Sequence, residues 1–246
     1  MLDWVLAVCL ASLRIGPAFA FAPPFTLVRL PAMVRAAMVI AFALTLLGME
    51  GSGQAQAWRG SFVTAAASEL ALGLAMALML QWAFGLIGMA GRALDIQAGF
   101  GLAFLIDPTT RAQMPLIGAL FGYAAAAVFF ATDGPYDVLG VFAASFRALP
   151  LGGAMAPDAA QQLITYLGLV SVMALGVAGL ASTVLFLIDL VVAMMSRTLP
   201  QMNVLVLGFQ IKAMAALLLL PLTLGFSAGV IARILRLASE AMVRVI

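Results

Sequence analysis

The sequence contains no histidine and only one cysteine, Cys9, among its 246 residues. The chain therefore lacks the side chain most often used as a general base near neutral pH, which is also the commonest ligand of zinc, copper and haem iron. A single cysteine cannot form an intrachain disulfide or a thiolate metal site. No nucleotide-binding loop or serine nucleophile motif is present either. We therefore expect no catalytic, cofactor-binding or metal-binding residues, and no enzyme.

Charged residues are also scarce, at 9% of the chain, whereas hydrophobic residues make up 65%. The formal net charge is +2, and Lys212 is the only lysine. Because the arginines do not cluster, we do not expect the chain to bind nucleic acid. An apolar fraction this far above one half is typical of membrane proteins. Each charge in such a chain is expensive to bury, so it is a candidate for pairing, for a subunit contact or for function.

Six runs contain the roughly 20 mostly apolar residues that a helix needs to span a bilayer. They are rich in Ala, Leu, Met and Gly and do not alternate with period two, which favours helices over barrel strands. The predicted fold is an all-α membrane protein with about six long hydrophobic helices arranged as hairpins. The runs are 4–21, 33–48, 62–90, 115–131, 163–196 and 204–231.

The arginines do not fit a simple alternating topology. Positive charge in short loops should mark the cytoplasmic side of a membrane. The acidic connection at about 132–160 is then external, which agrees with Arg29 and Arg35 in the first connection. Arg197 and the arginines of the C-terminal tail, however, are separated by one span and cannot both be cytoplasmic. Either the run 163–196 folds as a bent pair, or some helices pack into a larger assembly without crossing the bilayer.

The most polar stretch between the apolar runs begins at Arg92 and Asp95, which are three residues apart and would be neighbours on a helix. Pro108 and Pro115 disfavour a helix through the second part of the stretch. The sequence therefore predicts a loop near 107–115 and a new helix after it. This loop is either a solvated connection or a buried re-entrant element, which is tolerated at depth where protein or water surrounds it.

Two further patterns concern polar groups inside apolar helices. Glu69, Gly73, Ala77, Gln81 and Gly85 recur at intervals of four, so they share one helical face. Small residues permit close backbone approach, and the pattern therefore predicts contact with another helix.

Asp189 is the most isolated acid in the chain. It is either a proton or ion site, or a structural partner for Lys212, for Arg14 or for a neighbouring subunit. We favour the structural interpretation, because proton-coupled transport usually needs several convergent carboxylates. The alternative function from a different class is a small ion-coupled transporter that uses Asp189, Glu69 and Lys212. Such a transporter would be expected to contain internal repeats, and we find none in the sequence.

The motifs along the whole chain resemble those of the FliR family, an export-gate subunit of flagellar type III secretion with an injectisome counterpart. The most specific stretch runs from Arg197 to Lys212. Two departures are Gln210, where the family usually has proline, and Gly134-Pro135, where Gly-His is common. The residues that carry the resemblance are Arg14, Pro17, Pro31, Arg35, Glu69, Gly73, Ala90, Gly91, Asp95, Gln97, Gly99, Phe100, Asp107, Pro108, Met114, Pro115, Ser145, Phe146, Leu149, Pro150, Leu151, Gly152, Arg197, Pro200, Gln201, Met202, Asn203, Val204, Gly208, Phe209 and Lys212.

The resemblance implies a single domain over 1–246 that assembles into a closed helical export gate. The implied location is the bacterial inner membrane at the base of the flagellum. The implied partners are FliP-like and FliQ-like membrane proteins, a FlhB-like switch protein, a FlhA-like export protein, membrane lipid and unfolded export substrates in transit. The injectisome system is the alternative within the same family.

Two groups of site residues follow. The resemblance implies a plug of the export channel at about 106–117, formed by Ile106, Asp107, Pro108, Met114, Pro115, Leu116 and Ile117. Intersubunit or buried polar contacts are expected at Arg14, Glu69, Arg92, Asp95, Gln97, Asp189, Arg197, Gln201, Asn203 and Lys212.

Overall fold

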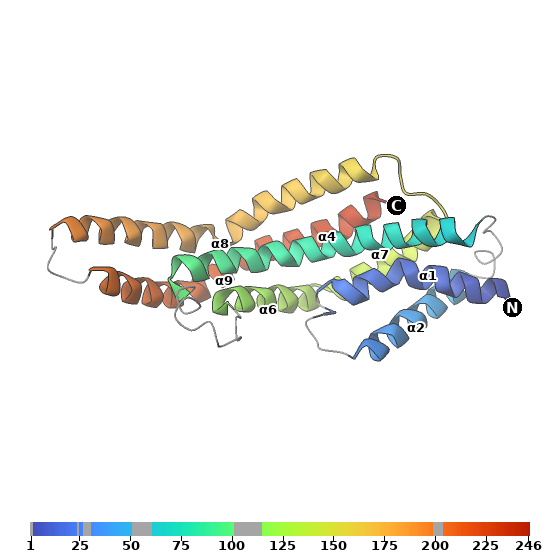
Figure 1. Cartoon of the computed structure of the whole chain (residues 1–246), viewed down its shortest axis with the longest axis horizontal. Coiled ribbons are helices and arrows are strands. Elements are labelled where there is room, and N and C mark those ends of the chain that lie inside the picture. The colour runs from blue at the N-terminus through green and yellow to red at the C-terminus, as the bar shows by residue number, and fades with distance from the viewer. Residues whose placement is uncertain (1, 24, 27–30, 51–60, 101–114, 199–203) are drawn as a thin grey trace. The chain divides into compact units, whose positions relative to one another are not determined.

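The computed structural model describes residues 2–23, 25–26, 31–50, 61–100, 115–198 and 204–246. Seven α-helices occupy most of these residues, which contain no strand (Figure 1). The prediction of an all-helical chain is confirmed. The helices are α1 (Leu2–Phe21), α2 (Ala32–Glu50), α4 (Phe62–Gln97), α6 (Leu116–Ala131), α7 (Gly134–Ala148), α8 (Ala159–Thr198) and α9 (Val204–Arg244).

Five of the described helices, α1, α2, α4, α8 and α9, are long and apolar enough to cross a membrane. The sixth predicted span, 115–131, forms the 16-residue α6 and continues after a short break as α7. At the break Asp133 adopts a left-handed conformation with φ of 57°, and a proline follows in the first turn of α7. A proline there lacks the N–H that would continue α6 but suits the start of a new helix. The pair is therefore a sixth candidate span only as a broken helix.

Two expectations about connections change accordingly. The acidic segment at about 132–160, which we expected to be a loop, contains α7 over residues 134–148. The run 163–196, in contrast, lies within the continuous 40-residue helix α8. A bent pair in that run therefore does not explain the conflict between the arginines and a simple topology.

The described helices contribute to two compact units. Unit 1 consists of residues 1–83, 129–169 and 235–246, and unit 2 consists of residues 84–128 and 170–234. Because α4, α8 and α9 contribute to both, neither unit is a continuous stretch of chain.

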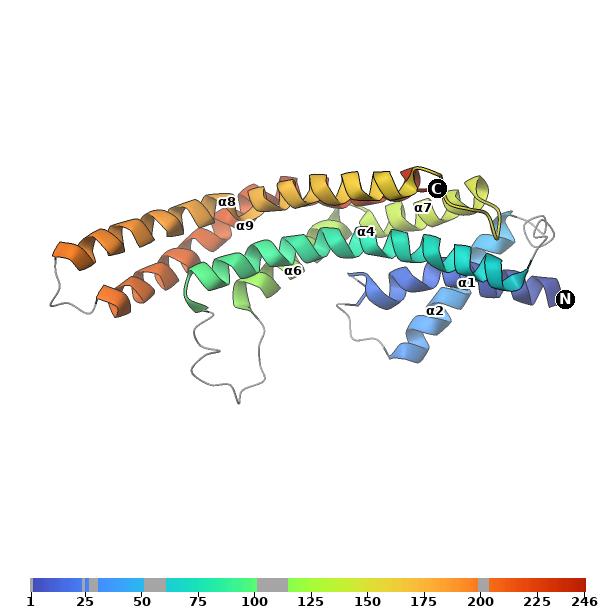
Figure 2. The same cartoon turned by 45° about the horizontal axis from the view of Figure 1, so that its top comes forward.

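In unit 1, α1 and α2 form an antiparallel hairpin (Figures 1 and 2). The backbone of α1 also approaches α4 closely at Gly73, where a Cβ atom would lie only 2.8 Å from the carbonyl oxygen of Leu13. Only glycine fits such an approach without a shift of one backbone. Of the face that we predicted on α4, Glu69, Gly73 and Ala77 are buried. The remaining two positions of that face, further along the helix, are exposed.

In unit 2, α8 and α9 run antiparallel beside each other (Figures 1 and 2). A second close approach joins α4 to α6, because a Cβ atom on Gly91 would lie 2.9 Å from the Cα atom of Gly118. The side chains of Ile87, Leu94 and Phe121 are buried around this contact. Small residues therefore set the spacing of helices in both units, as expected where lipid gives no hydrophobic drive for helix association.

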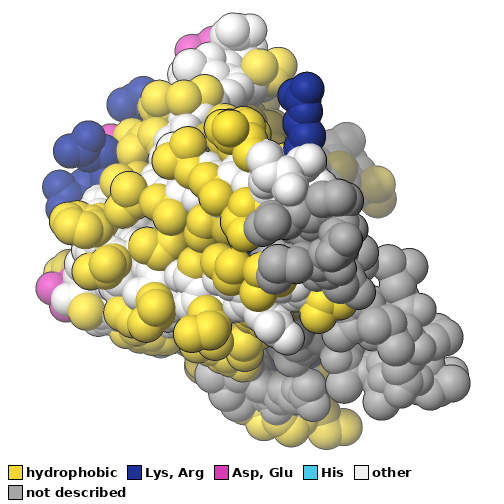
Figure 3. All heavy atoms as spheres, turned by 90° about the vertical axis from the view of Figure 1, so that its left-hand side faces the viewer, with side chains coloured by type: hydrophobic (Ala, Val, Ile, Leu, Met, Phe, Trp, Pro, Cys, Tyr) yellow, Lys and Arg dark blue, Asp and Glu magenta, His cyan; other side chains and the backbone are white. Residues whose placement is uncertain are grey.

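The described helices expose many large apolar side chains. Phe226 and Leu218 of α9 and Leu175 of α8 are 74%, 73% and 77% exposed. Hydrophobic side chains also dominate the face drawn in Figure 3, where lysine and arginine lie towards its edges. Isolated exposed apolar residues are common on soluble proteins, but whole exposed apolar helices are not. These surfaces fit a membrane protein that contacts lipid or other membrane proteins.

Candidate functional site

Residues 106–114 of the predicted plug lie outside the described residues, whereas Pro115, Leu116 and Ile117 are described. Leu116 begins α6 and is 52% exposed, while Ile117 is buried. The helices that bracket the predicted plug, α4 before it and α6 after it, both belong in this region to unit 2. The contacts of these two helices therefore show how the described residues on either side of the predicted plug are held.

Asp95, near the end of α4, caps the first turn of α6. Its two carboxylate oxygens accept hydrogen bonds from the backbone N–H groups of Ile117 and Gly118, each at 2.9 Å. The first N–H groups of a helix have no partner within the helix, and a buried carboxylate there also suits the helix dipole. Asp95 is only 3% exposed, so these bonds are shielded from water. Arg92, by contrast, is exposed, and its Cγ atom lies against Gly118.

Gln97, the last residue of α4, bonds to α8. The Ser182 hydroxyl donates to the Gln97 side-chain oxygen at 2.8 Å, and the Gln97 amide donates to the Ser182 carbonyl at 3.2 Å. The end of α4 is thus fixed to α6 through Asp95 and to α8 through Gln97. The chain leaves this fixed point to enter the segment that we predicted to form the plug.

Asp189 of α8 and Lys212 of α9 form an ion pair at 2.8 Å in unit 2. Their side chains are 43% and 15% exposed, and the Lys212 ammonium also lies 5.4 Å from the ring centre of Phe209. Lys212 is the first of the structural partners that we considered for Asp189 in the sequence analysis. Arg197 is exposed at the end of α8, whereas Gln201 and Asn203 lie outside the described residues.

The most extensive polar network lies in unit 1 and centres on Arg14 of α1. Its guanidinium forms a bidentate pair with Glu69 of α4, through Nε to Oε2 at 2.5 Å and Nη2 to Oε1 at 2.8 Å. Both side chains are almost completely buried, with 0% and 1% exposure. A buried ion pair repays its desolvation only if the remaining donors and acceptors are also satisfied.

Arg14 meets this condition by binding the C-terminal end of α7. Its Nη1 donates to the carbonyl oxygens of Ser145 and Leu149 at 2.9 and 3.1 Å, and its Nη2 also donates to the Leu149 carbonyl, at 3.1 Å. The last carbonyl groups of a helix lack partners within it, and a cation there complements the helix dipole. The guanidinium also lies 4.4 Å from the ring centre of Phe146.

Glu69 is satisfied in the same way, because its Oε1 also accepts a hydrogen bond from the backbone N–H of Gly152 at 2.8 Å. The network therefore joins α1, α4 and the end of α7 with the connection that follows it. Ser145 and Phe146 carried part of the family resemblance, but the sequence did not show that they contact Arg14. At the end of α7 the acceptors are mainly the backbone carbonyls of Ser145 and Leu149, which leave no signal in residue type.

The described residues contain no cluster of three or more metal-binding side chains. A model of the family described as "Bacterial export proteins, family 1" matches residues 5–238 of the chain. The chain belongs to this family. The match includes all the described polar contacts above, so the Arg14 network and the Asp95 cap lie within the family region.

Two kinds of curated relative share this similarity to the export family. The flagellar biosynthetic protein FliR of Bacillus subtilis (strain 168) is 26% identical over 249 residues, which cover 98% of this chain and 95% of that protein. FliR of Escherichia coli (strain K12) is 26% identical over 71% of this chain and 69% of its own length. The surface presentation of antigens protein SpaR of Salmonella typhimurium is 25% identical, covering 96% and 89%. The resemblance to the FliR family is therefore confirmed.

Proposed function

We propose that the chain is the FliR-like subunit of a flagellar type III export gate and forms part of the protein-export channel. The observation that carries this proposal is the family match over residues 5–238, together with FliR relatives aligned over nearly the whole chain. The exposed apolar helices support it, because a subunit embedded among membrane proteins and lipid needs such surfaces. The proposed location is the bacterial inner membrane.

The proposed partners are the FliP-like and FliQ-like membrane proteins, with the FlhB-like and FlhA-like proteins of the same apparatus. In this assembly the segment 106–117 would form part of the plug. The contacts of Asp95 and Gln97 support this role, since a plug needs a rigid base from which to close the channel. Arg197, Gln201 and Asn203 remain proposed contacts with neighbouring subunits.

A second candidate is the injectisome subunit of the same family, which the alignment with SpaR over 96% of this chain favours. The ion-coupled transporter is less well supported. Glu69 is held by Arg14 and a backbone N–H, and Asp189 is paired with Lys212, so neither carboxylate is free to carry an ion.

The proposal is tested by purifying the tagged chain in detergent after expression with its neighbouring membrane genes. Native mass spectrometry of the intact material then gives its stoichiometry. We expect a large complex that contains one copy of this chain and several copies of the two small partners. A monomer or simple dimer, with those partners present and folded, would contradict the gate.

The choice between the two systems needs a cellular assay. The gene is introduced into a strain that lacks its own flagellar gate subunit, and swimming is compared with secretion of injectisome substrates. Restored swimming supports the flagellar assignment, and restored injectisome secretion alone favours the second candidate.

A further inference from the structure

Two motifs that lie far apart in the sequence meet in unit 2. Gly99 comes directly after the end of α4, and Phe209 belongs to the first turns of α9. A Cβ atom at Gly99 would lie only 2.6 Å from the Cδ1 atom of Phe209 and 2.9 Å from its Cε1 atom. The ring of Phe209 therefore packs directly against the backbone of Gly99. Both residues carried part of the family resemblance, but the sequence did not show that they are in contact.

The backbone of Gly99 sets the direction in which the chain leaves α4. Its φ of 86° lies in the left-handed region, which other residue types seldom adopt. Its N–H donates a hydrogen bond to the carbonyl of Ile96 at 3.1 Å. A left-handed glycine directly after the last helical residues is a common way for a helix to end and for the chain to turn away. Gly99 is thus required both by the turn and by the ring that lies against it.

The ring of Phe209 is itself held by α8 and α9. Gly208 is buried, and a Cβ atom there would lie 2.9 Å from the Cγ1 atom of Val192, so α9 lies close to α8 at this point. The Lys212 ammonium is 5.4 Å from the ring centre, within the range of a cation–π contact. The same ammonium lies 2.8 Å from the Asp189 carboxylate. A half-exposed ion pair contributes little to overall stability, but this one also places the ammonium beside the ring.

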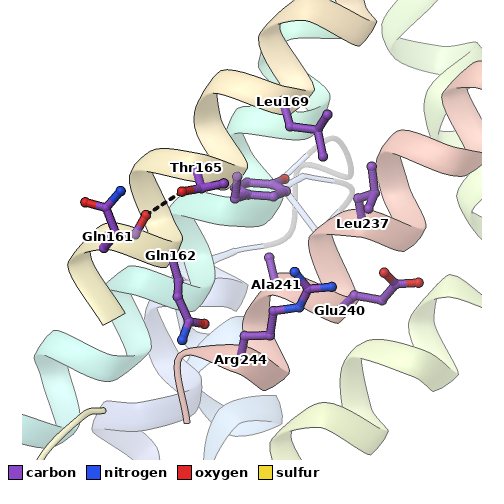
Figure 4. Close-up of a pocket in the computed structure, with 9 residues that line it drawn as sticks. Gln161, Gln162, Thr165, Leu169, Leu237, Glu240, Ala241 and Arg244 are labelled. Carbon is purple, nitrogen blue, oxygen red and sulfur yellow. Dashed lines mark hydrogen bonds between the residues drawn. The ribbon is translucent and has the colours of Figure 1, made fainter. Parts of the chain in front are cut away.

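The same two helices also meet in unit 1, without such a contact. There the beginning of α8 and the end of α9 line a pocket of about 320 Å³ (Figure 4). Arg244 lies at this pocket and forms no ion pair within the described part of the chain. The pocket is lined by residues of α8 and α9 alone. Arg244 is therefore a charged residue of α9 that takes no part in the contact at Gly99.

We propose that Phe209 is a positioning residue for the export gate. Its ring holds Gly99, and the Asp189–Lys212 pair holds the ring, so the point at which the chain leaves α4 is fixed to α8 and α9. The chain continues from this point to the segment that we assigned to the plug. The inference rests on the proposed function, because Phe209 has this role only if that segment closes the channel.

Potassium efflux from liposomes that contain the purified complex tests this role. Only complexes with the wild-type stoichiometry, established by native mass spectrometry, are compared. Phe209→Ala should increase the efflux rate about fivefold or more, because loss of a packed ring shifts a local equilibrium by at least about this factor. Phe226→Ala is the matched control, since Phe226 belongs to the same helix and unit and is 74% exposed. It should keep the wild-type rate.

The contribution of the ion pair is tested in the same assay. Lys212→Gln removes the cation beside the ring but leaves the ring in place, so the efflux rate should rise less than in Phe209→Ala. Arg244→Gln also removes a positive charge from α9, but at the pocket of Figure 4, and it should keep the wild-type rate.

Amide hydrogen exchange of the chain alone in detergent gives a readout that does not depend on the gate. Phe209→Ala should raise the exchange rate at Gly99 about fivefold or more, and Phe209→Leu should raise it less. The amide of the buried Ile87, further back in α4, should keep its wild-type rate. A general loss of stability would instead raise exchange at both positions.

Deletion of residues 107–114 separates failure of this inference from failure of the gate. If the deletion raises the efflux rate while Phe209→Ala keeps the wild-type efflux and exchange, the positioning role is overturned and the plug is retained. If the deletion leaves the complex closed, the plug is contradicted and the role of Phe209 with it. Should Phe209→Ala not assemble, Phe209→Leu and Lys212→Gln take its place, and wild-type efflux in both overturns the proposal.

Discussion

At the scale of single residues, Arg14 is the side chain that joins α1 to both α4 and the end of α7 in unit 1. Its guanidinium has five N–H donors, and Glu69, Ser145 and Leu149 supply acceptors to all three of its nitrogen atoms. A lysine could place the same charge there but not the same fork of donors. The residue therefore acts through geometry as much as through charge, and we assign it a structural role within the subunit.

We expect Glu69→Gln to destabilise the chain strongly. The substitution keeps the size of the side chain but leaves the Arg14 guanidinium buried without a counter-charge, which costs about 3–5 kcal/mol. The measurement is the yield and the midpoint of thermal unfolding of the chain purified in detergent.

Glu240→Gln is a suitable control for this substitution, because Glu240 is exposed and outside the network. It should unfold close to the wild-type temperature. If Glu69→Gln also unfolded there, the pair would contribute little, and the carbonyl contacts of Arg14 would be sufficient to hold α7.

At the scale of elements, close helix contacts are set by a few glycines out of many. A Cβ atom at Gly73 would meet backbone oxygens of α1, whereas a Cβ atom at Gly85, three turns later in the same helix, would meet nothing within 4 Å. Gly225 and Gly229 of α9 are also four residues apart, but a Cβ atom at either position would meet nothing within 4 Å. The spacing of glycines alone did not distinguish these positions.

The contrast within α4 gives a matched pair of substitutions. Gly73→Ala should lower stability by about 1–3 kcal/mol, because two backbones must separate to admit the methyl group. Gly85→Ala should be neutral or raise stability by up to about 1 kcal/mol, since alanine favours a helix. Thermal unfolding of both variants in detergent decides the matter, and equal effects would contradict the close approach of α1 and α4.

The start of α6 depends on another element for its cap. Asp95→Ala should expose the first N–H groups of α6 and cost about 1 kcal/mol of local stability. We expect amide hydrogen exchange at Ile117 and Gly118 to rise about fivefold or more. Asp137→Ala, which removes an exposed acid from the first turn of α7, should leave these amides unchanged. Unchanged exchange in Asp95→Ala would mean that the cap does not hold the base of the proposed plug.

At the scale of the whole molecule, composition and apolar runs were enough to predict the helical membrane class. Arg14, Glu69 and Asp95 could be singled out because charges are rare in this chain. The backbone groups that these side chains contact could not be predicted, since every residue has a carbonyl and every residue except proline has an N–H group. The end of the apolar run at residue 131 was predicted as α6 has it, but the acidic residues after it predicted a loop, whereas α7 begins at Gly134 directly after the left-handed Asp133.

The exposed apolar surfaces also belong to this scale. In α2, α8 and α9 only 22% of the most apolar window is buried within the chain. A chain of this kind completes its packing in lipid or against other subunits, so its stability depends on its surroundings. Helices that contact other subunits in the assembled gate, and do not cross the bilayer, are not subject to the positive-inside rule. Such contacts would explain why the arginines gave no consistent topology.

The Arg14 network also has a consequence in time. Glu69 follows Arg14 in the chain by 55 residues, but the Ser145 carbonyl follows it by 131. At ordinary rates of synthesis the ribosome needs on the order of ten seconds to reach the second partner. During that interval α1 and α4 can form their ion pair, while the remaining donors of the guanidinium have no acceptor from α7. The contacts between α1 and α7 therefore form only after residue 145 has been synthesised, later than the ion pair between α1 and α4.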